Sequence, residues 1–325
     1  MIIPRYWAEA RLKQRDGKRQ ASLRRFGWSD SSQAEAQAHA DTRLQEALAR
    51  WQAGEPLLRR ERQQAYGGEG VPIREEILRQ EGDCVITRNA YGAHCLNSPG
   101  LLFADIDFPE LHHPTGCLDL LGWLLPLAAA GCWFFGAEFG RSVALALLLV
   151  FVVWRLFAWR RRKQREASHK PEETALARID AFVASHPDWS LRLYRSPAGL
   201  RVMATQRAFD PLEPAVSEFF AALDVDPLYA SLCREQRCFR ARLTAKPWRI
   251  AMQDRLSPRS ARWPVVPELA EARQAWIADY EQRAKAFAAC RFLKRIGKDR
   301  TDPALSAAIK LHDRLSGSLE KRPLA

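Results

Sequence analysis

The stretch Leu101-Leu102-Phe103-Ala104-Asp105-Ile106-Asp107 decides the fold that we expect for this chain. Apolar residues run up to two acids and Pro109 follows, so the stretch is predicted to be a buried strand that ends at Asp107. Because side chains alternate along a strand, Asp105 and Asp107 project from the same face, about 7 Å apart. Two carboxylates placed in this way repel each other unless a cation lies between them. Oxygen ligands of this kind suit Mg²⁺ or Mn²⁺, so both acids are candidate metal ligands and candidate catalytic residues.

Further strands and helices follow this stretch in an order typical of an α+β protein. Residues 191–195 and 200–204 are predicted strands, and the turn Ser196-Pro197-Ala198-Gly199 joins them. An amphipathic helix is expected before them, and two shorter helices are expected after them. A last strand, residues 238–243, leads into Lys246-Pro247-Trp248-Arg249.

The order of strand, Asp-x-Asp, helix, strand, Gly-containing turn and strand resembles the catalytic core of the archaeo-eukaryotic primase superfamily, which includes primase-polymerases. The resemblance implies a primase-like sheet-and-helix domain in which Asp105 and Asp107 bind metal. It also implies that Ser196, Gly199 and the residue at position 201 handle the nucleotide phosphates. The family has His at this last position, where this chain has Arg201, which can grip a phosphate but cannot carry a proton.

The primase-like family places a third acid on a later strand, and the corresponding strand here carries Arg240 and Arg242 instead. A complete two-metal site is therefore not expected from this sequence. Together with Lys246 and Arg249, the two arginines form a cationic run that is predicted to bind phosphate. Trp248 suits base stacking beside it. The alternative is a solvated edge strand whose charges prevent edge-to-edge pairing.

Residues 1–56 are predicted to form a small β-β-α unit. Asp16-Gly17 is a two-residue hairpin turn, and Ser32 with Glu35 makes a capping box for the helix that follows. The unit resembles the arm-type DNA-binding domain of tyrosine recombinases, and a basic accessory unit is the alternative. At the other end of the chain, residues 267–295 are predicted to form one long helix.

Residues 118–137 and 142–159 are almost uncharged apolar segments, joined by Glu138-Phe139-Gly140-Arg141. Each is long enough to cross a bilayer, so they predict a transmembrane hairpin of two helices, with a buried hairpin of a soluble protein as the alternative. The basic run at residues 160–165 then predicts, by the positive-inside rule, a two-pass protein of the bacterial-type inner (cytoplasmic) membrane with both termini in the cytoplasm. The lipid bilayer is accordingly an expected partner.

Composition narrows the classes of function. The 50 Lys and Arg residues against 38 Asp and Glu give a net charge of +12, which favours phosphate-rich partners. The 47% apolar content excludes a disordered chain. The seven Cys residues include no CxxC pair, so ordinary thiols are expected rather than a zinc site. His112-His113 offer a further metal ligand, or alternatively lie in a solvated linker.

The sequence therefore predicts a membrane-anchored, primase-like protein that binds nucleotides or nucleic acid with a divalent metal. If it is an enzyme, the expected activity is metal-dependent nucleotidyl transfer. A non-catalytic membrane scaffold or interaction protein with a degenerate primase-like fold is the alternative, and a lipid- or partner-sensing protein is a third. The predicted parts are residues 1–56 (β-β-α unit), 57–109 and 171–255 (primase-like domain), 110–170 (hairpin and basic linker) and 256–325 (C-terminal helical region).

Overall fold

The computed structural model describes residues 1–16, 19–61, 71–108, 133, 138–168, 171–252, 256 and 263–325. Contacts between residues divide the chain into two compact units. The larger unit consists of Met1–Asp107 and Ala175–Ala325, and the smaller one is Phe108–Thr174.

The chain begins with the β-hairpin and helix that the sequence predicts. Strands β1 (Tyr6–Asp16) and β2 (Arg19–Ser29) pair in an antiparallel ladder, and helix α1 (Gln33–Gln52) follows. The side chain of Ser32 caps α1 by accepting a hydrogen bond from the Glu35 backbone N–H at 3.1 Å. Gly27 permits the close packing of α1 on β2, because a Cβ at this position would overlap backbone atoms of Ala36 and Ala40.

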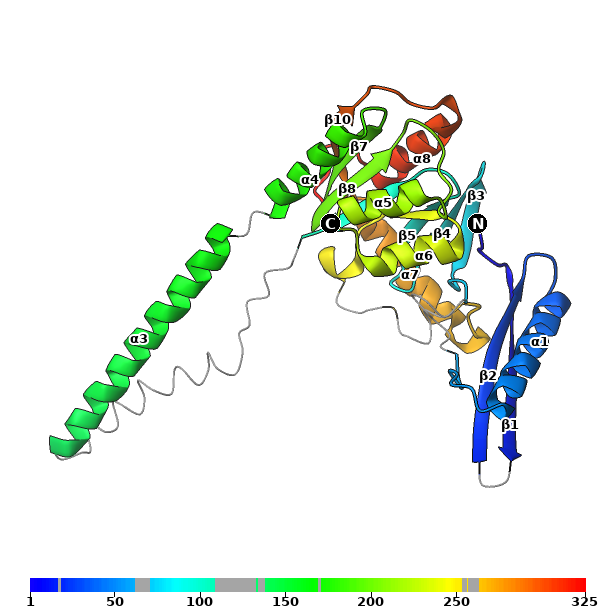
Figure 1. The fold of residues 1–325 in the computed structure, drawn as a ribbon, viewed down its shortest axis with the longest axis horizontal. Helices are drawn as coiled ribbons and strands as arrows, with labels where there is room; N and C mark the ends of the chain where they lie inside the picture. The colour runs from blue at the N-terminus through cyan, green and yellow to red at the C-terminus, as the bar shows by residue number, and fades with distance from the viewer. Residues whose placement is uncertain are drawn as a thin grey trace. The chain divides into compact units, whose positions relative to one another are not determined.

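Two four-stranded antiparallel sheets form the centre of the larger unit (Figure 1). The first has the order β10 (Arg291–Gly297), β7 (Ser190–Ser196), β8 (Gly199–Ala204), β6 (Phe103–Asp107). The second has the order β3 (Glu76–Glu81), β4 (Cys84–Arg88), β5 (His94–Ser98), β9 (Phe239–Arg242). The predicted α+β class is confirmed.

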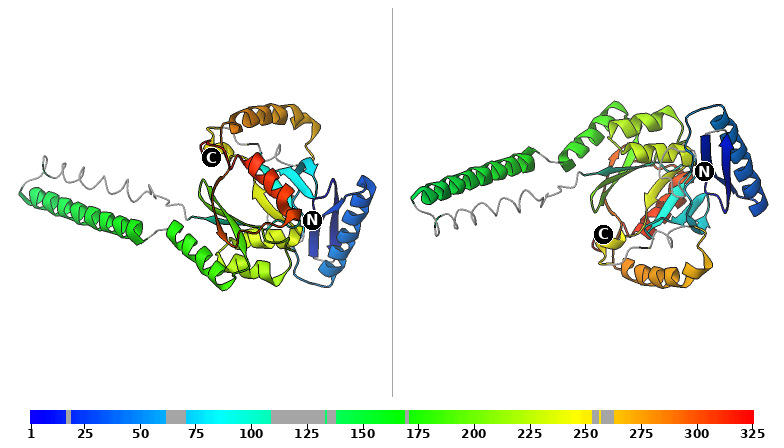
Figure 2. Two further views of the ribbon diagram at one scale, coloured as in Figure 1. Left: turned by 90° about the horizontal axis from the view of Figure 1, so that it is seen from above. Right: turned by 90° about the horizontal axis from the view of Figure 1, so that it is seen from below.

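Helices pack on both sides of the first sheet. Figure 2 shows α8 (Ser306–Ser316) on one side of β7 and β8, and α4 (Pro171–Ser185) with α5 (Pro214–Ala222) on the other. On the α4 side, the rings of Phe182 and Trp189 both contact Phe219, with centroids 5.1 and 4.9 Å away. The remaining helical segments of this unit are α6 (Pro227–Gln236), α7 (Ala270–Ala284) and the 3₁₀ turns η1 (Pro247–Arg249), η2 (Pro267–Leu269) and η3 (Pro303–Leu305).

Strand β6, which the sequence predicts as a strand ending at Asp107, pairs antiparallel with β8. Asp105 lies directly opposite Arg201, and Asp107 lies opposite Gly199. The segment just before β6 belongs to the other sheet, where β5 pairs with β9. The chain thus passes from the second sheet to the first between β5 and β6. It returns to the second sheet at β9, after β8.

The prediction of one long helix over residues 267–295 is wrong. Helix α7 ends at Ala284, and Arg291–Gly297 is strand β10, which pairs with β7. The segment between them also bonds to the C-terminal tail, since the Ala288 N–H donates to the Pro323 carbonyl at 2.9 Å. Backbone pairing with distant strands therefore overrides a spacing of apolar residues that is compatible with a helix.

The predicted transmembrane hairpin and inner-membrane location are contradicted. Among the residues that the structure describes, no helix is both long enough and apolar enough to cross a membrane. Helix α3 (Glu138–Ser168) has 31 residues and contains the predicted span 142–159. Almost all of the other predicted span, residues 118–137, lies outside the described residues. The lipid bilayer as a partner is not tested by this finding and stays a prediction.

Replacing Gly199 with Ala tests the close pairing of β6 and β8. A Cβ at position 199 would overlap the Ile106 carbonyl oxygen, so the two strands would have to move apart. We expect the variant to lose about 1–3 kcal/mol of unfolding free energy in urea denaturation, the usual cost of overpacking. Ala198→Ser in the same turn is the control and should unfold like the wild type. Equal stability of Gly199→Ala and the wild type would contradict this packing.

Candidate functional site

The buried guanidinium of Arg201 organises the predicted site. Arg201 is 2% exposed, and its Nε and Nη2 donate to the two carboxylate oxygens of Asp105 at 2.7 and 2.9 Å. Its Nη1 donates to the Arg242 carbonyl of β9 at 2.9 Å. One side chain therefore connects both sheets, and both oxygens of Asp105 are engaged.

The two predicted metal ligands have different electrostatic surroundings. Burial alone would raise the pKa of Asp105, but the charge and hydrogen bonds of Arg201 outweigh it and hold that pKa below its ordinary value. The pKa of Asp107 is raised, mainly by partial loss of solvent and then by repulsion from Asp105. The nearby charges of Lys246 and Arg242 oppose this rise. Asp105 is thus neutralised by the protein itself, whereas Asp107 keeps an unfavourable charge at the strand end.

The donor set at β6 does not fit a two-metal site. Among the described residues, no group of three or more His, Cys, Asp or Glu side chains could hold a metal ion. Arg201 already occupies the oxygens of Asp105 that a metal would need. His112 and His113, which the sequence offers as a further ligand, lie outside the described residues. Binding of Mg²⁺ or Mn²⁺ stays a prediction.

Ser196 and Gly199 close the hairpin between β7 and β8, where they form the last cross-strand pair. The need for glycine at position 199 follows from the contact with Ile106. Strand packing alone therefore explains this turn, and its role in phosphate binding stays a prediction.

All four residues of the predicted cationic run are half-buried, and they divide into a sheet half, Arg240 and Arg242 on β9, and a surface half, Lys246 and Arg249 at η1. Arg240 donates to both carboxylate oxygens of Glu75, at 2.7 and 2.6 Å. Arg242 donates to the Thr244 carbonyl at 2.7 Å, and burial followed by the charge of Arg201 lowers the pKa of Arg242. Arg240 thus links β9 to Glu75, and Arg242 links β9 to the residues that follow it. Lys246 and Arg249, by contrast, lie at the partly exposed turn η1.

Two exposed aromatic rings adjoin the surface half, and we call Tyr91, Lys246, Trp248 and Arg249 the aromatic edge. The rings of Tyr91 and Trp248 meet edge to face, with centroids 5.3 Å apart and planes at 88°. They are 52% and 44% exposed, which is unusual for large rings in contact. The Lys246 ammonium lies 5.4 Å from the Trp248 ring centroid. Trp248 was predicted as a stacking residue, whereas Tyr91 was not among the predicted site residues.

Hydrogen bonds fix the loop that carries Tyr91. The Asn89 side-chain oxygen accepts from the backbone N–H groups of Tyr91 and Ala93, both at 3.0 Å. Arg88 donates to the Gly92 carbonyl at 3.0 Å. Gly92 has φ of +91° and lies against the Trp276 ring, which leaves no room for a side chain. The loop is therefore rigid before any ligand arrives.

Helix α7 supports the second loop of the aromatic edge. Its Tyr280 hydroxyl donates to the Ala245 carbonyl at 2.7 Å, next to Lys246. The Tyr280 ring stacks on Trp276, with centroids 5.3 Å apart and planes at 6°. Since Trp276 also contacts Gly92, one face of α7 positions both loops.

The sequence analysis missed a buried cluster at α8. His312 lies between the rings of Phe103 and Tyr194, at 5.2 and 5.1 Å, and its Nε2 is 3.3 Å from Nη1 of Arg201. Cys290 and Asp313 flank it. The only signal in the sequence was the adjacent pair His312-Asp313 in an amphipathic segment.

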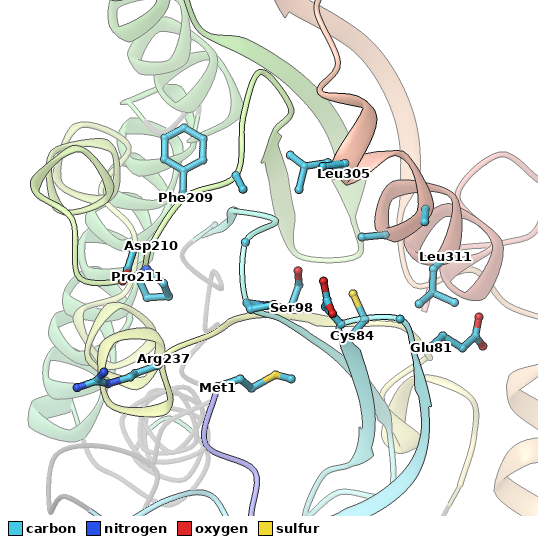
Figure 3. A pocket seen from close by; sticks show the side chains of 18 residues that line it. Met1, Glu81, Cys84, Ser98, Phe209, Asp210, Pro211, Arg237, Leu305 and Leu311 are labelled. Carbon is cyan, nitrogen blue, oxygen red and sulfur yellow. The ribbon is translucent and has the colours of Figure 1, made fainter.

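A hollow of about 960 Å³ opens elsewhere in the larger unit (Figure 3). Cys84 and Ser98 lie on its floor, and Phe209, Leu305 and Arg237 are among the residues around it. None of the site residues predicted from the sequence lines this hollow. It is therefore distinct from the surroundings of Asp105 and from the aromatic edge.

Comparison with known proteins adds no identification. The chain matches no protein family, no curated protein and no solved structure. The primase-like resemblance accordingly stays a hypothesis, and the function has to be inferred from the geometry.

Asparagine substitutions of the two acids should shift stability in opposite directions at neutral pH. Asp105→Asn leaves a buried guanidinium without its counter-charge. We expect a loss of about 2–3 kcal/mol, less than for a fully buried pair because the Asp105 side chain is 34% exposed. Asp107→Asn removes a repelled carboxylate and should leave the protein as stable or slightly more stable.

Urea denaturation at several pH values checks this expectation. Because folding lowers the pKa of Asp105, its contribution is present above the unfolded value of about 3.9 and is lost as the pH falls through the folded value. For Asp107 the sign is reversed, so any gain from Asp107→Asn should fade at acidic pH. A stabilised Asp105→Asn protein would contradict the assignment.

Proposed function

We propose that this protein binds nucleotides or single-stranded nucleic acid at the aromatic edge, and that Asp105 serves the fold rather than a metal ion. The observation that carries the proposal is the exposed, rigid pair of Tyr91 and Trp248 with the Lys246 ammonium over the indole. Stacking of a base on an aromatic side chain contributes about 1–3 kcal/mol and tolerates any base.

Charge and rigidity support this proposal. Lys246 and Arg249 place cations beside the rings, where the phosphates of a stacked nucleotide would lie. Both loops are held by hydrogen bonds and by α7, so little conformational entropy is lost on binding. The net charge of +12 adds a long-range attraction for polyanions.

Metal-dependent nucleotidyl transfer is the second candidate. In its favour, Asp105 and Asp107 share one face of β6, and repulsion between them raises the pKa of Asp107. The pairing of β6 with β8 also agrees with the primase-like resemblance. This function would require Arg201 to release Asp105, and it needs ligands beyond those on β6.

Alanine at Trp248 tests the proposal. Fluorescence anisotropy with a labelled oligo(dT) strand, in the presence of EDTA, should give an affinity about 5- to 100-fold weaker for Trp248→Ala than for the wild type. Tyr91→Ala should act in the same direction. Tyr6→Ala removes a 38% exposed ring from β1 and should leave the affinity unchanged.

The salt dependence separates stacking from phosphate contacts. Lys246→Glu with Arg249→Glu should weaken binding and flatten the plot of log affinity against log salt, because fewer counterions are released. Trp248→Ala should weaken binding without changing that slope. Equal affinities of wild type and Trp248→Ala would refute the proposal, and binding that appears only with Mn²⁺ would favour the second candidate.

A further inference from the structure

Cys290, His312 and Asp313 form a chain of three hydrogen-bonding groups in the core of the larger unit. The Cys290 sulfur is 3.9 Å from His312 Nε2, and His312 Nδ1 is 3.1 Å from Asp313 Oδ1. Cys290 and His312 have no exposed surface, and Asp313 is 7% exposed. A thiol, an imidazole and a carboxylate in this order are the groups that activate a nucleophilic sulfur.

The carboxylate of Asp313 is fixed by its other partners. The Tyr194 hydroxyl and the Ser318 hydroxyl donate to Oδ1 at 2.8 and 3.0 Å, and Arg192 donates to Oδ2 at 2.6 Å. Burial alone would raise the pKa of Asp313, but the hydrogen bond and charge of His312, followed by the Tyr194 hydroxyl and the charge of Arg192, lower it. An ionised Asp313 keeps Nδ1 of His312 protonated, so Nε2 can accept the proton of Cys290.

The surroundings of Cys290 favour its thiolate. Burial alone would raise the pKa of Cys290, but the hydrogen bond and charge of His312, followed by the charge of Arg201, lower it below the ordinary value. Burial alone would lower the pKa of His312, but hydrogen bonds to Asp313 and Cys290 raise it, against the opposing charge of Arg201. Both net shifts act in the direction that favours proton transfer from Cys290 to His312.

The other cysteines that the structure describes lack this arrangement. These other cysteines are Cys84, Cys95, Cys233 and Cys238. They are free and buried, as Cys290 is, so solvent exposure does not distinguish them from Cys290. For each of the four, burial raises the pKa, to about 12 for Cys233 and about 11 for Cys238. They provide an internal control within the same folded protein.

We propose that Cys290 is a site of oxidation by hydrogen peroxide. The Cys290 thiolate attacks one peroxide oxygen, the O–O bond breaks, and a sulfur–oxygen bond forms. Sulfur is oxidised by two electrons to the sulfenic acid, and the departing hydroxide takes the proton of the His312 imidazolium and leaves as water. Peroxide is close to water in size, so a small local opening of the core admits it.

Oxidation at Cys290 would affect the predicted site through His312. Because Cys290 is fully buried, an oxygen atom added to its sulfur must displace a neighbouring group. His312 lies beside Nη1 of Arg201, which also holds Asp105 and the Arg242 carbonyl. This inference concerns a different group from the aromatic edge and does not depend on nucleic-acid binding.

The test oxidises the native full-length chain with hydrogen peroxide, removes the peroxide with catalase, and unfolds the protein in dimedone to trap sulfenic acids. Peptide mass spectrometry then gives a rate for each cysteine. Cys290 should be labelled at least 10-fold faster than Cys84, Cys95, Cys233 and Cys238. Equal rates, or no labelling of Cys290, would overturn the proposal.

The pH dependence in the wild type tests the role of His312 without a variant. An ordinary thiol of pKa about 8.5 loses reactivity roughly 10-fold per unit below that value. Because the pKa of Cys290 is lowered, its labelling rate should fall less steeply between pH 8 and pH 6 than that of an ordinary thiol, and a fall as steep as an ordinary thiol's would overturn the proposal. His312→Gln, if it folds, should slow labelling at least 10-fold at pH 7 and restore the ordinary pH dependence, and an unchanged rate would contradict the pairing.

Discussion

A guanidinium without solvent requires a negative charge beside it, and Asp105 supplies that charge to Arg201 across the ladder of β6 and β8. The remaining nitrogen of Arg201 donates to the Arg242 carbonyl in the other sheet and lies next to His312 of α8. The two sheets and α8 therefore meet at one side chain. Loss of the charge on Asp105 should therefore weaken the contacts of Arg201 with both sheets and with α8.

This arrangement separates the structural part of the site from the part that can meet a ligand. Asp105, Arg201 and Arg240 are engaged in ion pairs that hold strands together. The aromatic edge lies at two loops supported by α7, where large rings and cations are partly exposed. We therefore infer that the loops recognise a ligand and that Asp105 of β6 and Arg201 of β8 stabilise the fold.

Local sequence patterns predicted several helices and strands correctly, but they did not predict which distant segments pair with one another. The capped helix α1 and the strand that ends at Asp107 follow from turn residues, a capping box and uninterrupted apolar runs. Residues 267–295 carry a spacing that fits a helix, yet β10 forms because β7 and the C-terminal tail supply its backbone partners. The transmembrane prediction was based on two long apolar runs, but among the described residues no helix is both long enough and apolar enough to cross a membrane.

The candidate site could be predicted only in part, because its central contact joins residues 96 positions apart. The primase-like resemblance assigned Arg201 to a phosphate, since no pattern in the sequence shows that its counter-charge, Asp105, lies opposite it on the neighbouring strand. Trp248 was expected to stack, while Tyr91 and His312 were missed because only the fold brings them to their partners.

A double-mutant cycle tests the central claim most directly. Urea denaturation at pH 7 of the wild type, Asp105→Asn, Arg201→Met and the double variant gives the interaction energy of the pair. If Asp105 serves to neutralise Arg201, the free energy of unfolding of the double variant should exceed the value expected from adding the two single losses by about 2 kcal/mol or more. Single losses that add to within about 0.5 kcal/mol would contradict the account.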